Sequence, residues 1–104
     1  MGRKKNIDHL KDFKRELAKS IPVEKMILFG SRAHGKASKW SDFDLIIVSK
    51  MFRATKFRYR PLGFYQYWNL DYPVDFLCYT PEEFKKLRKQ VSIVSEAIQN
   101  GVEI

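Results

Sequence analysis

Two aspartates at the start of an apolar segment are the first residues whose types and spacing could do chemistry. Asp42 and Asp44 stand two residues apart in SDFDLIIVS. On a β-strand, alternate residues point to the same face, so these carboxylates are expected to lie side by side, with Phe43 and Leu45 pointing the other way. Like charges held together repel, and protonation or a bound cation relieves the repulsion. The pair therefore predicts a site for a hard divalent ion such as Mg²⁺, although Ser41 and Asp42 alone also fit a structural turn or cap.

A third acid, Asp75, lies inside another strand-like segment, PVDFLCYT. A carboxylate between Val74 and Phe76 is out of place in a core strand unless it faces a site. If this strand lies beside the one that carries Asp42 and Asp44, the three acids come together. The structural alternative is an ion pair between Asp75 and an arginine in the core.

A glycine and a serine precede the paired acids, at the point where a predicted strand ends and a short helix begins. Gly30 lets an anion approach the backbone closely, and N–H groups at a helix start bind anions. Ser31 adds a hydroxyl donor, while Arg32 and Lys36 add positive charge. A loop that holds phosphates beside carboxylates that hold metal is what phosphoryl or nucleotidyl transfer requires.

The elements that must position these residues follow from hydrophobic periodicity and end signals. Apolar residues recur at three- and four-residue steps in the first helix, and Thr80, Pro81 and Glu83 form a helix-start signature. We expect helix 6–19, strand 23–30, short helix 31–35, strand 43–49, helix 61–69, strand 73–80, and helical structure from 81 to a stop at Gly101, before a final VEI that is either a short strand or a frayed end. This order predicts an α/β layer fold with a small sheet.

Length and composition bound the class of protein. The 104 residues, of which 44% are hydrophobic, fit a single domain spanning 1–104. No apolar run reaches the length of a membrane span, and the start lacks the apolar stretch of a secretory signal, so we expect a soluble cytoplasmic protein. Cys78 is the only cysteine, which excludes an internal disulfide and favours a small buried hydrophobe.

Positive charge is unevenly distributed along the chain. The net charge is +8, and no acidic residue occurs between Leu45 and Leu70. A second basic group spans residues 85–89. Such a surface would attract a nucleotide, a nucleic acid or an acidic partner, and it is equally compatible with a solvated face.

Taken together, these motifs resemble a known superfamily. Gly30-Ser31, then ten residues, then Asp42-x-Asp44, with Asp75 on a later strand, is similar to the nucleotidyltransferase superfamily of DNA polymerase β. The segment GSRAHGKASKWSDFDL in particular resembles the minimal nucleotidyltransferases of prokaryotes. The likeness covers most of the chain and implies a small mixed β-sheet flanked by helices. His34 stands where many relatives carry another polar or basic residue, and we attach no mechanism to it.

The resemblance also implies roles for the site residues. Asp42 and Asp44 would coordinate two Mg²⁺ ions, and Asp75 would ligate one ion or help deprotonate the acceptor hydroxyl. Gly30 and Ser31 would hold the β- and γ-phosphates of a nucleoside triphosphate, with ATP as the expected substrate, and Arg32 would be a further phosphate contact. The acceptor oxygen would attack the α-phosphate in line, and pyrophosphate would leave.

The acceptor is not encoded in these motifs. Larger members of the superfamily add a domain that holds the acceptor, so a second copy, another protein or a nucleic acid is expected to complete the site. Minimal members are commonly paired with HEPN-type ribonuclease toxins, which they silence by attaching AMP to a tyrosine, and an antitoxin role is the leading hypothesis. A non-catalytic binding module and transfer to a small molecule are the alternatives. The aromatic cluster around Pro61 fits a partner interface, base stacking or simple packing, and Trp40 fits either a nucleotide cover or a core cap.

Overall fold

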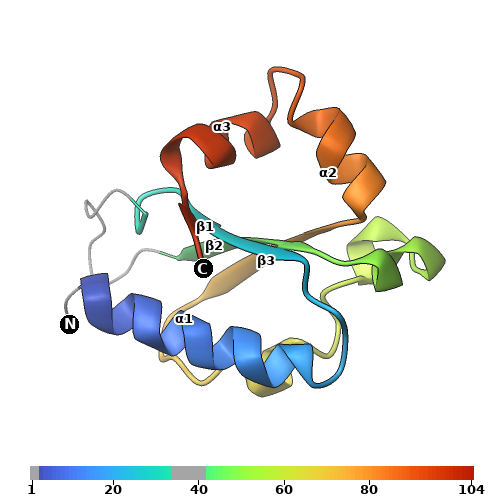
Figure 1. Cartoon of the computed structure of the whole chain (residues 1–104). Helices are drawn as coiled ribbons and strands as arrows, with labels where there is room; N and C mark the ends of the chain where they lie inside the picture. The colour runs from blue at the N-terminus through green and yellow to red at the C-terminus, as the bar shows by residue number, and fades with distance from the viewer. Residues whose placement is uncertain (1–2, 34–41) are drawn as a thin grey trace.

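One mixed β-sheet forms the centre of the molecule (Figure 1). The structure is a computed structural model, and it describes residues 3–33 and 42–104. Its strands are β1 (Lys25–Phe29), β2 (Phe43–Val48), β3 (Val74–Tyr79) and β4 (Val102–Glu103). They lie in the order β3-β2-β1-β4, with β1 antiparallel to β2 and β4, and β2 parallel to β3. The small mixed sheet is therefore confirmed, and the final VEI contributes an edge strand.

Helices cover both faces of this sheet (Figure 1). They are α1 (Arg3–Ala18) on one face and α2 (Pro81–Leu87) and α3 (Ile93–Asn100) on the other. The apolar stripe of α1 packs onto the sheet through Leu10, Phe13 and Leu17, which are all buried. None of the helices in the described ranges is both long and apolar enough to cross a bilayer.

The β2 strand is buried on both sides, which explains its continuous apolar run. Phe43, Leu45 and Ile47 belong to the cluster that packs under α1, whereas Ile46 belongs to the cluster under α2 and α3. Since alternate residues share a face, Asp44 points to the same side as Ile46. The acid thus lies at the end of a face that is otherwise covered by the C-terminal helices.

The two C-terminal helices both begin with a capping box. Thr80 Oγ1 accepts a hydrogen bond from the Glu83 N–H at 3.1 Å, and Glu83 Oε1 accepts one from the Thr80 N–H at 2.8 Å, as predicted. Ser92 and Ser95 form an equivalent pair at the start of α3, which ends just before Gly101. The predicted helical region is therefore two short helices, because Ser92 starts a new one.

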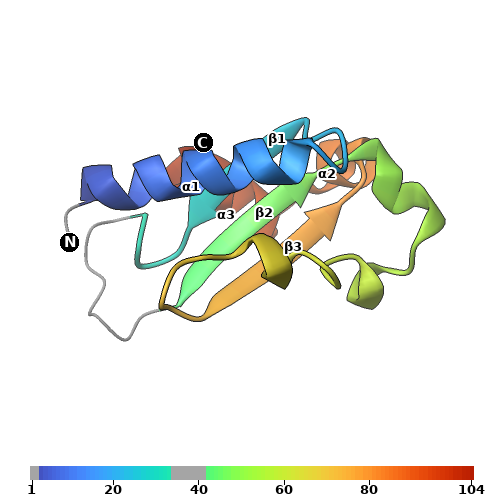
Figure 2. The same cartoon turned by 90° about the horizontal axis from the view of Figure 1, so that it is seen from below.

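The predicted helix over residues 61–69 is wrong. The connection between β2 and β3 instead contains three 3₁₀ helices, at Lys50–Ala54, Phe57–Tyr59 and Tyr65–Tyr67. Gly63 explains the difference, because its φ of +94° lies in the left-handed region, which a right-handed α-helix cannot contain. Viewed from below, β2 and β3 run in the same direction, and this connection begins beyond the arrowhead of β2 (Figure 2).

The predicted short helix over 31–35 is described only in its first part. Residues 31–33 form a turn, closed by a hydrogen bond from the Ala33 N–H to the Gly30 carbonyl at 3.1 Å. The remainder of that segment, which includes His34, lies outside the described residues, as do Lys36 and Trp40.

Candidate functional site

Asp44 and Asp75 are direct neighbours on adjacent strands. The parallel register of β2 and β3 pairs Asp44 with Asp75, as Leu45 pairs with Phe76. Asp75 is exposed and Asp44 is half-buried. Within the described residues, no hydrogen bond or ion pair engages the carboxylate of either one. The prediction that β3 lies beside β2 is confirmed, and this pairing brings Asp75 to Asp44. The alternative of a core ion pair for Asp75 finds no support in the described part of the chain.

Asp42 completes the acidic group from the position just before β2. Its side chain is exposed, while the intervening Phe43 is fully buried. Burial, then the charge of Asp75, then the charge of Asp42 raise the pKa of Asp44 above its ordinary value. The charges of Asp75 and Asp42 therefore both act on Asp44, and a cation near Asp44 would relieve both the repulsion and the cost of burial.

The turn at Gly30 brings the backbone close to Asp44. The antiparallel register of β1 and β2 pairs Phe29 with Asp44, so the next residue, Gly30, turns directly past this carboxylate. Gly30 has a φ of +77°, and a Cβ added to it would lie 2.6 Å from Asp44 Oδ2. A side chain at this position would be strained and would displace the carboxylate. The glycine is therefore required by two independent features of the site, its backbone conformation and the closeness of Asp44.

Arg32 lies between two aromatic rings. Its guanidinium carbon is 4.4 Å from the ring centroid of Phe43 and 4.3 Å from that of Tyr72. Contacts of this kind stabilise a cation on a ring face. Arg32 thus ties the Gly30 turn to the start of β2 and to the segment before β3. The sequence predicts Arg32 only as a phosphate contact and does not predict its contact with Tyr72. The one local indication of Tyr72 is that it is an aromatic residue shortly before Asp75.

The three acids offer the type of ligand atom that a divalent metal ion prefers. Among residues 3–33 and 42–104, no three Asp, Glu, His or Cys side chains converge as a ready ligand set. The candidate donors are nevertheless all carboxylate oxygens, which suit Mg²⁺, and their mutual repulsion at Asp44 is the condition that a cation relieves. Asp42, Asp44 and Asp75 are therefore the residues that would hold such an ion.

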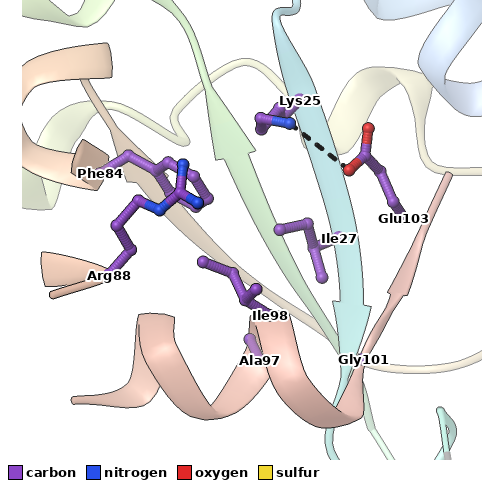
Figure 3. Close-up of a pocket in the computed structure, with 8 residues that line it drawn as sticks. All are labelled: Lys25, Ile27, Phe84, Arg88, Ala97, Ile98, Gly101 and Glu103. Atoms are coloured by element: carbon purple, nitrogen blue, oxygen red, sulfur yellow. Dashed lines mark hydrogen bonds and ion pairs between the residues drawn. The ribbon is translucent and has the colours of Figure 1, made fainter. Parts of the chain in front are cut away.

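A hollow on the same sheet face is lined by residues other than the three acids, and Figure 3 shows its lining. It lies between α2, α3 and β1, and Lys25 at its rim forms an ion pair with Glu103 at 3.5 Å. Since Lys25 pairs with Val48 across the sheet, this hollow lies toward the opposite end of β2 from Asp44. A different hollow, of about 220 Å³, borders Gly30 and is lined in part by Glu96 of α3.

Comparison with known protein families identifies the family to which this chain belongs. The family model described as "Nucleotidyltransferase domain" matches residues 9–100, a range that includes the Gly30 turn and all three acids. The chain belongs to the nucleotidyltransferase domain family. It is a minimal member of that family and a transferase, and nucleotidyl transfer is the general activity of the group.

Individual nucleotidyltransferases support this assignment. The chain is 33% identical over 89 residues to the "Probable protein adenylyltransferase MntA" of Haemophilus influenzae. The aligned region covers 84% of this chain and 78% of that protein. A crystal structure from Sulfolobus solfataricus, described as a "putative nucleotidyltransferase", superimposes with a TM-score of 0.68. The match covers 97% of this chain and 80% of the other, at 22% identity, and so it confirms the fold alone. Nucleotidyltransferases of this family generally use a nucleoside triphosphate and a divalent metal.

Proposed function

We propose that this nucleotidyltransferase transfers AMP from ATP to a hydroxyl group of a partner protein, in a reaction that depends on Mg²⁺. The observation that carries the proposal is the register of the sheet. It sets Asp44 beside Asp75 on one side, and Gly30 beside Asp44 on the other. The residues proposed to hold phosphate, metal and the acceptor proton are thus adjacent at Gly30, Asp44 and Asp75. The similarity to the probable protein adenylyltransferase of Haemophilus influenzae supports AMP as the group and a protein as the acceptor.

Each site residue has a distinct task in this proposal. Asp42 and Asp44 would hold the divalent ions, which would supply positive charge for an in-line displacement at the α-phosphate, with pyrophosphate as the leaving group. Gly30 offers its backbone to the triphosphate without a Cβ in the way, and the Ser31 hydroxyl donates to a phosphate oxygen. The exposed Asp75 carboxylate accepts the proton of the attacking hydroxyl or ligates an ion near it.

Arg32 has two candidate tasks. Its stacking on Phe43 and Tyr72 supports a role in holding the Gly30 turn in place. Its position one residue after Ser31 also keeps it a candidate phosphate contact. An Arg32→Lys variant separates the two, because lysine keeps the charge for a phosphate but stacks less well on rings.

The resemblance to minimal nucleotidyltransferases supports a specific biological role. We propose that the partner is a HEPN-type ribonuclease, that the acceptor is one of its tyrosines, and that the modified enzyme is silenced, which makes this chain the antitoxin of a toxin–antitoxin pair. The exposed basic surface is compatible with a protein partner, although it does not by itself identify one.

The test uses ATP labelled at the α-phosphate, Mg²⁺, and the protein encoded by the neighbouring gene. We expect label on a tyrosine of that protein, and loss of labelling with Asp42→Asn, Asp44→Asn or EDTA. Asp71→Asn is the matched control, since it removes an exposed acid just before β3 without touching the proposed site. Absence of transfer from any of the nucleoside triphosphates would overturn the proposal. Neutralisation of the partner that survives Asp44→Asn would point instead to a binding protein that acts without catalysis.

A further inference from the structure

Large apolar side chains are exposed along the first half of the connection between β2 and β3. This segment, residues 50–62, is called the basic arm here. Four of the eight exposed large apolar side chains in the described part of the chain lie on it, with Leu62 66% and Met51 54% exposed. The other two are Phe57 and Tyr59. An apolar surface concentrated on one short segment is typical of an interaction site.

The basic arm is held in a defined conformation by a buried arginine. Arg60 is 9% exposed, and its guanidinium donates to the Thr55 carbonyl at 2.8 Å and to the Cys78 carbonyl at 3.0 Å. It also donates to both carboxylate oxygens of Glu83, at 2.6 and 3.3 Å. These bonds fasten the arm to β3 and to α2. The exposed side chains are therefore preorganised, which lowers the entropy lost when a partner binds.

The charges on the basic arm select an acidic partner. Lys50, Lys56 and Arg58 have no carboxylate partner among the described residues, whereas Arg53 pairs with Glu82. No acidic residue occurs on the arm itself. Unpaired cations beside apolar side chains match a surface that presents carboxylates around an apolar contact.

The side-chain types favour a protein over a nucleic acid. Binding to single-stranded nucleic acid relies on aromatic rings that stack on bases. The two most exposed apolar side chains of the arm, Leu62 and Met51, are aliphatic and do not stack. Aliphatic and aromatic side chains mixed with arginine are the composition of protein–protein contacts.

We propose that the basic arm is the docking surface for an acidic protein, and that this protein carries the acceptor hydroxyl. The second half of the proposal rests on the proposed function. The arm begins where β2 ends (Figure 2). Asp42 lies directly before the first residue of β2, at the other end of the strand. Six residues of strand separate the two, a length of roughly 20 Å. The partner therefore contacts the arm at one end of the sheet and presents its hydroxyl to the acids at the other.

The test compares two triple variants with matched changes in charge and polarity. The arm variant is Lys56→Glu, Arg58→Glu and Leu62→Ser. The control variant is Lys86→Glu, Lys89→Glu and Val91→Ser, which alters exposed residues near the end of α2. Circular dichroism confirms that both variants fold. The probes are a long, glutamate-rich random copolymer of glutamate and tyrosine, polyglutamate, and polyuridylate, with binding measured by fluorescence anisotropy.

We expect the wild-type chain and the control variant to bind the glutamate–tyrosine copolymer more tightly than polyglutamate. The arm variant should bind the copolymer at least about tenfold more weakly. Copolymer binding that is equal in the two variants, or absent in the wild type, would overturn the docking surface. Arm-dependent binding that is tighter for polyuridylate would overturn it in favour of a nucleic acid.

A transfer assay on the same copolymer with α-labelled ATP distinguishes failure of the docking surface from failure of the proposed activity. Arm-dependent binding without label on tyrosine would leave the docking surface standing and count against protein adenylylation. Equal labelling by the wild type and the arm variant would leave the activity standing and remove the docking surface. The Asp44→Asn variant should bind the copolymer as the wild type does, because Asp44 lies at the other end of β2.

Discussion

Replacing Gly30 with alanine tests whether the proposed phosphate loop and the proposed metal ligand Asp44 are one structural unit. The φ of +77° places the new side chain in the left-handed region, which costs about 1–2 kcal/mol for a residue other than glycine. The added Cβ would also lie 2.6 Å from Asp44 Oδ2, so the carboxylate has to move. We expect Gly30→Ala to lower the free energy of unfolding by about 2 kcal/mol. At roughly 4–8 °C for each kcal/mol, the melting temperature should fall by roughly 8–16 °C.

Gly63→Ala is the matched control. Gly63 has a φ of +94°, so alanine carries a similar backbone strain there, but the nearest atom to its Cβ is Gln66 Nε2 at 3.8 Å, an ordinary contact. Thermal unfolding followed by circular dichroism measures the strain common to both variants. Transfer of label from α-labelled ATP measures the nucleotidyl-transfer activity, which only Gly30→Ala should lose. A carboxylate displaced by about an ångström can reduce activity about a hundredfold.

Two results would refute this reasoning. If Gly30→Ala transferred label at the rate of Gly63→Ala, then the position of Asp44 would not depend on the missing side chain. If Gly63→Ala lost as much activity as Gly30→Ala, then the loss would reflect general destabilisation and not the contact with Asp44.

Three further changes have expected outcomes. Arg60→Ala leaves two carbonyl groups and a carboxylate without their donor, so urea unfolding should show a loss of about 2–4 kcal/mol. Burial and the neighbouring carboxylates raise the pKa of Asp44, so the ionised form of Asp44 destabilises the fold. The free energy of unfolding should therefore increase as the pH falls through the pKa that Asp44 has in the folded protein. Asp44→Asn should abolish that rise and increase the melting temperature at neutral pH, while transfer falls at least about a hundredfold. Burial raises the pKa of Cys78 to about 12, against a smaller opposing effect of Arg60, so a thiol reagent at pH 8 should label it only at the rate of unfolding.

Local patterns in the sequence were enough to predict most of the elements and the meeting of two of the acids. The capping box at Thr80 and the apolar stripe of α1 each depend on residues within one or two turns of helix, so they can be read directly. Asp44 and Asp75 meet because both strands alternate with a period of two and their apolar runs align. A buried Cys78 was predicted on the same grounds and is confirmed.

Other features depend on contacts between distant parts of the chain. Pro61 is typical of a helix start, but the left-handed Gly63 and the hydrogen bonds of Arg60 to β3 and α2 hold this segment in 3₁₀ turns. The stacking of Arg32 on Tyr72 joins residues 40 positions apart, and no local pattern encodes it. Tertiary context thus overrides propensity in the segments that flank the sheet.

The parallel pairing of β2 and β3 determines which segments of this chain can accept inserted residues and which cannot. Residues 50–62 lie outside the sheet, so an insertion there lengthens the connection without altering which residues of β2 and β3 face each other. A single residue inserted within β3 ahead of Asp75 would instead shift the alternation, turning this acid into the core and Phe76 out of it. Related chains can therefore be expected to diverge in length at the far end of the sheet while the spacing around Asp44 and Asp75 stays fixed.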